Sequence, residues 1–149
     1  MIKRTRIALI HATPVAVDPI AQSFRDLWPD AEPLGILDDG LAIDRAAAGA
    51  PTEELSDRIG ALAAYGASTG AKAILFTCSA FGTAIKAAAR ALPIPVLKPN
   101  EAMFEEALGF GDDIGMVATF GPAVARMEEE FFEEAKRIRP TAPIRTHLA

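Results

Sequence analysis

In Ile74-Leu75-Phe76-Thr77-Cys78-Ser79-Ala80-Phe81-Gly82, an apolar strand passes into a helix through small and hydroxyl side chains. Cys78, the only cysteine of the chain, therefore lies at a predicted helix N-terminus. Converging backbone N–H groups at such a position favour the reactive thiolate. In one interpretation, Cys78 is reactive and the flanking hydroxyls of Thr77 and Ser79 hydrogen-bond a substrate carboxylate. In the other, Cys78 is a small buried hydrophobic residue, as many single cysteines are.

The same alternation of strand and helix extends along the whole chain. Periodicity predicts strands at residues 6–10, 32–37, 73–77, 95–97, 114–118 and 144–147. It predicts helices at residues 18–27, 52–65, 81–91, 101–108 and 122–139. This pattern favours an α/β fold in which a parallel sheet is flanked by helices on right-handed crossovers. Residues 38–51 are predicted as a long loop, either a mobile loop over a site or an ordinary surface excursion.

Composition and charge exclude several classes of partner. The chain has 149 residues and a formal net charge of −5, which argues against nucleic acid as a partner. No apolar run reaches the roughly 20 residues that a membrane span needs. One cysteine forms no internal disulfide, so we expect a cytoplasmic protein. The acidic run Glu128-Glu129-Glu130, with Glu133 and Glu134, is predicted to be a solvated helix face.

Hydroxyl side chains follow the predicted strand ends at three places: Thr13, Thr77 with Ser79, and Thr119. Hydroxyls and free N–H groups at neighbouring helix starts would form a pocket for a carboxylate or an enolate oxygen. The alternative is that each threonine caps the helix behind it. His11 either contacts substrate or is a plain polar loop residue. Two isolated histidines, His11 and His147, predict no metal site.

Three segments carry a resemblance to a known family: Phe76-Thr77-Cys78-Ser79-Ala80, Pro95-Val96-Leu97-Lys98-Pro99-Asn100-Glu101-Ala102-Met103 and Ile114-Gly115-Met116-Val117-Ala118-Thr119-Phe120. In order and spacing they resemble the aspartate/glutamate/hydantoin racemase superfamily. The resemblance implies two pseudo-symmetric α/β lobes with the active site between them. It also implies proton transfer without a cofactor, by two cysteines on opposite faces of the substrate carbon.

The same resemblance assigns roles to individual residues. Cys78 matches the catalytic cysteine of the first lobe, and Thr77 and Ser79 match its flanks. Thr119 matches a second-lobe threonine that holds the substrate carboxylate. Together with positions near the first strand end, the substrate-binding set is His11, Thr13, Pro14, Thr77, Ser79 and Thr119. Residues 1–98 are then the first lobe, and residues 99–149 are the start of an incomplete second lobe.

The chain departs from the family pattern in two ways. His11-Ala12-Thr13-Pro14 lacks a glycine-rich opening and looks more like hydantoin racemases or arylmalonate decarboxylases. No position matches the second cysteine, whereas the decarboxylases keep that cysteine and lack the first. We therefore expect a cofactor-independent racemase or isomerase of a small carboxylate, such as an amino acid or a hydantoin. The alternatives are a decarboxylase or cis–trans isomerase of a related diacid, and a non-catalytic protein that binds small anions. An incomplete second lobe would expose apolar faces, so we also expect a homo-oligomer.

Overall fold

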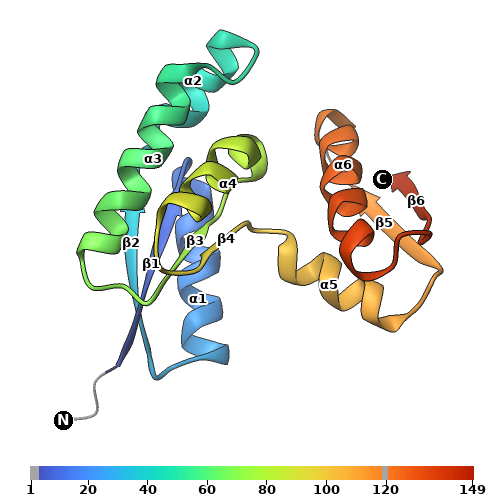
Figure 1. Ribbon diagram of the computed structural model, residues 1–149, viewed down its shortest axis with the longest axis horizontal. Helices are drawn as coiled ribbons and strands as arrows, with labels where there is room; N and C mark the ends of the chain where they lie inside the picture. The colour runs from blue at the N-terminus through green and yellow to red at the C-terminus, as the bar shows by residue number, and fades with distance from the viewer. Residues whose placement is uncertain (1–3, 119–120) are drawn as a thin grey trace. The chain divides into compact units, whose positions relative to one another are not determined.

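The computed structural model describes residues 4–118 and 121–149. The chain divides into two compact units, Met1–Pro99 and Asn100–Ala149, here called unit 1 and unit 2. Each unit combines strands with helices along the chain (Figure 1). The units are described separately below.

Unit 1 is built on a four-stranded sheet. Its strands are β1 (Thr5–His11), β2 (Ala31–Leu37), β3 (Ala73–Phe76) and β4 (Val96–Leu97), in the order β2-β1-β3-β4. Every neighbouring pair is parallel. The predicted α/β fold with a parallel sheet is confirmed, and the strand bounds differ from the prediction by a residue or so. Because the strands are parallel, their carboxyl ends meet at one edge of the sheet.

The strand order determines which face of the sheet each helix of unit 1 covers. The helices are α1 (Val17–Leu27), α2 (Gly40–Ala48), α3 (Glu53–Ser68) and α4 (Gly82–Ala91), with short 3-10 turns η1 (Pro14–Ala16) and η2 (Ser79–Phe81). The chain moves one way from β1 to β2 and the other way from β2 to β3 and β4. Right-handed connections therefore place α1 on one face of the sheet and α3 and α4 on the other.

The core of unit 1 lies between the sheet and the helices α3 and α4, and α1 contributes no buried residue to it. Its most buried side chains include Ile10, Ile59, Ile74, Phe76 and Ile85. The spacing of Leu55, Ile59 and Leu62 predicts one apolar stripe on α3. Leu55 and Ile59 are buried as expected, whereas Leu62 is only partly buried and Ala63 is buried beside them. The Thr52 hydroxyl accepts a hydrogen bond from the Leu55 N–H at 3.2 Å and so caps this helix.

The loop predicted at residues 38–51 is wrong, because most of this segment is the helix α2. Its alanines are strong helix formers, and Leu41 on its inner side is fully buried. The helix ends at Gly49, whose φ of +68° is the left-handed conformation that closes many helices. The flanking glycines and the proline favour a loop by sequence alone, whereas the alanines between them favour the helix that forms.

Unit 2 is smaller and has its own core. It contains α5 (Glu101–Phe110), β5 (Ile114–Ala118), α6 (Gly121–Ile138) and β6 (Ile144–Leu148), and β5 pairs with β6 in parallel. The core includes Phe104, Leu108, Phe131 and Ala135. Phe104 and Phe131 meet edge to face, with ring centroids 5.8 Å apart.

The acidic run on α6 is not wholly solvated, which corrects the prediction. Glu130 and Glu134 are buried, at 7% and 8% exposure. The Glu130 carboxylate accepts a hydrogen bond from Asn100 Nδ2 at 3.0 Å, and Glu134 pairs with Arg137 at 3.2 Å. Buried carboxylates are tolerated here because each has such a partner.

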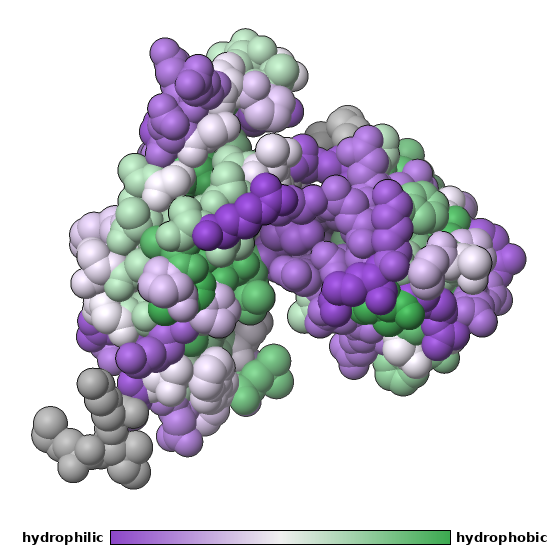
Figure 2. All heavy atoms as spheres, viewed as in Figure 1, coloured by the Kyte–Doolittle hydropathy of each residue, from purple (hydrophilic) through white to green (hydrophobic). Residues whose placement is uncertain are grey.

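The surface of unit 2 mixes polar and apolar side chains. Hydrophilic side chains cover much of the face seen in Figure 2. Exposed apolar side chains are nevertheless present, among them Phe110 at 87%, Val117 at 72% and Leu148 at 55% exposure. Within the part of the chain that the structure describes, no helix combines the length and apolar character that crossing a membrane requires.

Candidate functional site

Polar residues gather where three neighbouring strands of unit 1 end. His11 is the last residue of β1, Asp38 follows β2 directly, and Thr77 follows β3 directly. Backbone hydrogen bonds join these ends across the sheet, from Asp38 N–H to the His11 carbonyl at 3.1 Å and from Thr77 N–H to the Ile10 carbonyl at 3.0 Å. In open α/β sheets, ligands bind at this carboxyl edge.

His11 is a buried strand residue, so its interpretation as a plain polar loop residue is wrong. The residue is only 1% exposed. Its Nδ1 lies 2.9 Å from the Thr77 hydroxyl oxygen, and that oxygen lies 3.3 Å from the Ile10 carbonyl oxygen. Burial lowers the pKa of the imidazole below its ordinary value because it disfavours the charged form. Burial therefore favours the neutral imidazole.

Cys78 occupies the N-cap position of η2, directly after Thr77. Its backbone is extended (φ −131°, ψ 124°), and its side chain makes no capping hydrogen bond. The residue is half-buried and packs against the edge of the unit 1 core. Ser79 is the first residue of η2. The helical turn expected after the cysteine is thus a short 3-10 turn that leads into α4.

The threonines of the predicted pocket differ in their surroundings. Thr13 holds the N-cap position of η1 in an extended conformation, yet its side chain makes no capping hydrogen bond. The Thr77 hydroxyl is hydrogen-bonded to His11 and does not cap a helix. For these two residues, the alternative that they simply cap the following helix is therefore wrong. Pro14 is exposed at the first position of η1, and Thr119 lies outside the described residues.

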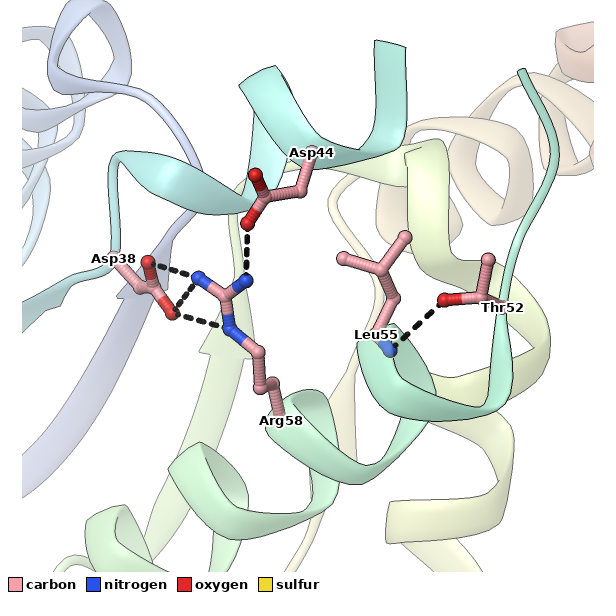
Figure 3. A network of polar contacts seen from close by, with 5 residues as sticks. All are labelled: Asp38, Asp44, Thr52, Leu55 and Arg58. Carbon is pink, nitrogen blue, oxygen red and sulfur yellow. Dashed lines mark hydrogen bonds and ion pairs between the residues drawn. The ribbon is translucent and has the colours of Figure 1, made fainter. Parts of the chain in front are cut away.

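A charged network beside this edge was not predicted from the sequence. Arg58 on α3 donates hydrogen bonds to Asp38, with Nη2–Oδ1 at 2.7 Å and Nε–Oδ2 at 3.2 Å, and also pairs with Asp44 on α2 (Figure 3). Hydrogen bonds raise the pKa of the Arg58 guanidinium above its ordinary value, with the larger effect from Asp38 and the smaller from Asp44. An acidic residue directly after a predicted strand was the signal that would have found Asp38. Nothing in the sequence spacing points to Arg58.

Two cavities of unit 1 lie away from Cys78. One of about 600 Å³ is at the opposite edge, where β1 and β2 begin, and is lined by Arg4, Thr5, Arg6, Glu32, Thr69, Gly70 and Lys72. Another of about 340 Å³ lies between α2 and α3. Among the described residues, no group of three or more His, Cys, Asp or Glu side chains is placed to hold a metal ion.

Comparison with protein families matches residues 10–139 to the Asp/Glu/Hydantoin racemase family. The chain belongs to the Asp/Glu/hydantoin racemase family. The matched range includes Cys78 and the hydroxyl residues at all three predicted strand ends: Thr13, Thr77 with Ser79, and Thr119. No curated protein matches the chain in sequence.

A solved structure supports the same fold for this racemase-family chain. Glutamate racemase from Aquifex pyrophilus is similar, with a TM-score of 0.65 and 17% sequence identity. The similarity covers 97% of this chain and 55% of the racemase chain, so this chain spans little more than half the length of that structure. At this identity the likeness establishes the architecture, and the substrate has to be argued from the site.

Proposed function

We propose that the chain carries out cysteine-dependent proton transfer at the α-carbon of a small carboxylate, without a cofactor. Candidate substrates are an amino acid, a hydantoin or a related acid. The observation that carries the proposal is the position of Cys78, in the range matched to the racemase family and at the carboxyl edge of the sheet. We assign Cys78 as the catalytic residue.

The proposed chemistry needs a base and a place for the developing negative charge. The Cys78 thiolate takes the α-hydrogen as a proton, and the electron pair of the C–H bond passes into the neighbouring carboxylate. Backbone N–H groups at the starts of η1 and η2 stabilise that charge. We propose that Thr13, Pro14, Ser79 and Thr119 contact the substrate, whereas His11 and Thr77 support the turn that carries Cys78.

Solvent-isotope exchange tests this chemistry directly. Each enantiomer of glutamate, of aspartate and of a 5-substituted hydantoin is incubated with the chain in heavy water. Isotope content and optical configuration are followed together. We expect one enantiomer to gain deuterium at the α-carbon, because the thiol exchanges its proton with solvent before returning one to the same face. Cys78→Ala lowers this exchange to the background rate.

The configuration of the product carries further information. Racemisation needs a second group to deliver a proton to the opposite face, and Cys78 is the only thiol of this 149-residue chain. We therefore expect exchange with retention and no net interconversion by this chain. Exchange that persists in Cys78→Ala, or racemisation that depends on Cys78, contradicts the proposed division of roles.

The other functions that the sequence left open are distinguished by other substrates and other measurements. A decarboxylase releases carbon dioxide from a disubstituted malonate, and a cis–trans isomerase converts maleate to fumarate. A small-anion-binding protein binds the carboxylate in calorimetry but exchanges no α-hydrogen. The presence of Cys78 at the first-lobe position favours proton transfer over decarboxylation, since the decarboxylase branches that the sequence resembles lack that cysteine.

We also propose that the protein acts in the cytoplasm, since its single cysteine forms no internal disulfide.

We further propose that copies of the chain self-associate. The exposed side chains of Phe110, Val117 and Leu148 support self-association, since apolar surface of this kind is commonly covered by a partner. Sedimentation velocity over a range of concentrations tests it. A single species with the mass of one chain at every concentration contradicts it.

A further inference from the structure

We propose that His11 is a positioning residue, whose Nδ1–H holds the Thr77 hydroxyl and thereby fixes the turn that carries Cys78. This inference rests on the proposed role of Cys78. It starts from the burial of His11, which is 1% exposed and yet polar. A buried imidazole costs free energy unless it is hydrogen-bonded, so its partner is the first thing to identify.

The partner is the Thr77 hydroxyl, 2.9 Å from His11 Nδ1. That hydroxyl also lies 3.3 Å from the Ile10 carbonyl oxygen, which accepts hydrogen bonds and cannot donate one. The hydroxyl has a single proton, so it bonds both neighbours only by donating to Ile10 and accepting from His11. The geometry therefore places a proton on His11 Nδ1, and the tautomer of the neutral imidazole that fits is the one with Nε2 unprotonated.

The consequence for the site follows from the chain direction. Thr77 is held on one side by its N–H, which donates to the Ile10 carbonyl at 3.0 Å, and on the other by its hydroxyl. The next residue is Cys78, whose own side chain makes no capping hydrogen bond to the turn. The position of Cys78 at the start of η2 therefore depends on how firmly Thr77 is anchored.

The other ring nitrogen faces a different strand. A Cβ atom added to Gly35 on β2 would lie 3.8 Å from His11 Nε2. The imidazole thus spans from β2 to the residue after β3, with Nδ1 directed toward Thr77. The two ring nitrogens have separate surroundings, which makes a variant that retains only one of them informative.

The first test measures the tautomer in the unchanged protein by nitrogen-15 NMR of the histidine rings. We expect the His11 Nδ1 shift of a protonated, pyrrole-type nitrogen and the Nε2 shift of an unprotonated one. The reverse assignment overturns the inference. This measurement needs no substitution and no substrate, so it decides the question even if a variant fails to fold.

The second test measures the rate of Cys78 alkylation by iodoacetamide in matched variants. His11→Asn places an amide N–H near the position of Nδ1, whereas His11→Gln places one near Nε2. We expect Thr77→Val and His11→Gln each to slow alkylation about fivefold, the effect of losing one ordinary hydrogen bond. We expect His11→Asn to keep the rate within about twofold, and the control His147→Asn, an exposed residue, to leave it unchanged.

The double variant His11→Gln with Thr77→Val separates positioning from a general loss of stability. If the two residues act as one unit, the double variant is no slower than either single variant. The inference is overturned if the double variant slows alkylation by the product of the two single effects. It is also overturned if His11→Asn and His11→Gln slow alkylation equally. Failure of the unchanged protein to exchange deuterium refutes the proposed chemistry of Cys78 but leaves the tautomer and this coupling measurable.

Discussion

Gly66 on α3 approaches β1 so closely that a single methyl group tests how the helix packs on the sheet. A Cβ at this position would lie 3.1 Å from the Ala8 Cβ and 3.7 Å from Ile74 Cδ1. Ala8 is fully buried on a central strand that pairs with β2 on one side and β3 on the other. The strand therefore has little room to move away.

Two opposing effects decide the outcome of Gly66→Ala. Alanine stabilises a helix interior by about 0.5–1 kcal/mol relative to glycine, and overpacking a tight core costs about 1–3 kcal/mol. We expect overpacking to win, with a net loss of about 1 kcal/mol in the free energy of unfolding. Gly60→Ala is the matched control on the same helix, since a Cβ there meets no atom within 4 Å. Gly60→Ala has the favourable helix propensity of alanine without overpacking, so its free energy of unfolding should rise by about 0.5–1 kcal/mol.

Urea unfolding followed by Trp28 fluorescence measures both variants. The single tryptophan and the single tyrosine, Tyr65, both belong to unit 1, so intrinsic fluorescence reports this unit. If Gly66→Ala is stabilised as much as Gly60→Ala, α3 does not pack on β1 at the described distance. The position of β1, and of His11 at its end, would then need revision.

Three further outcomes are expected. Burial lowers the pKa of His11 from 6.5, so below that pH the unfolded chain takes up a proton before the folded one does. The free energy of unfolding should then fall with decreasing pH by at most about 1.4 kcal/mol per unit. His11→Asn should remove this dependence and His147→Asn should keep it. Thr52→Ala, which removes the cap of α3, should lower stability in urea by about 1 kcal/mol, with Thr52→Ser close to the unchanged protein. Phe131→Ala, at a fully buried position of unit 2, should cost that unit about 3–5 kcal/mol and expose its amides to hydrogen exchange. The Trp28 unfolding midpoint should stay where it is if the two units fold separately.

The sequence predicts those elements whose pattern is local. The strand of Ala73–Phe76 is an apolar run of the right length, and α3 combines a buried stripe with a threonine cap. These features arise from side-chain spacing and from interactions within four residues, so they are visible without the fold. The order of the strands in the sheet is not predicted, because several orders satisfy the same alternation of strands and helices.

The prediction fails where tertiary contacts decide the local structure. Leu41 becomes fully buried only once α2 is packed, and this burial favours a helix over the predicted loop. Glu130 lies in an acidic run that is typical of a solvated face, yet its carboxylate is buried. It accepts a hydrogen bond from Asn100, which lies thirty residues earlier in the chain. Asp38 and Arg58 are twenty residues apart and meet only in the folded unit. Contacts of this kind leave no spacing signature.

The candidate site shows the same division at the level of single atoms. The sequence identifies the thiol of Cys78 as catalytic and gives the hydroxyl residues at strand ends a single role, that of binding substrate. In the structure the Thr77 hydroxyl is hydrogen-bonded to His11, and the Asp38 carboxylate is held by Arg58. Thr13 and Cys78 differ from these, since neither side chain caps the turn that it precedes. A ligand at this edge therefore meets side chains of two kinds. Those of His11, Thr77 and Asp38 are engaged in hydrogen bonds at the strand ends, whereas those of Thr13 and Cys78 make no capping hydrogen bond. The proton transfer that we propose for Cys78 would benefit from this division, because catalytic groups work best when the side chains around them are already held in place.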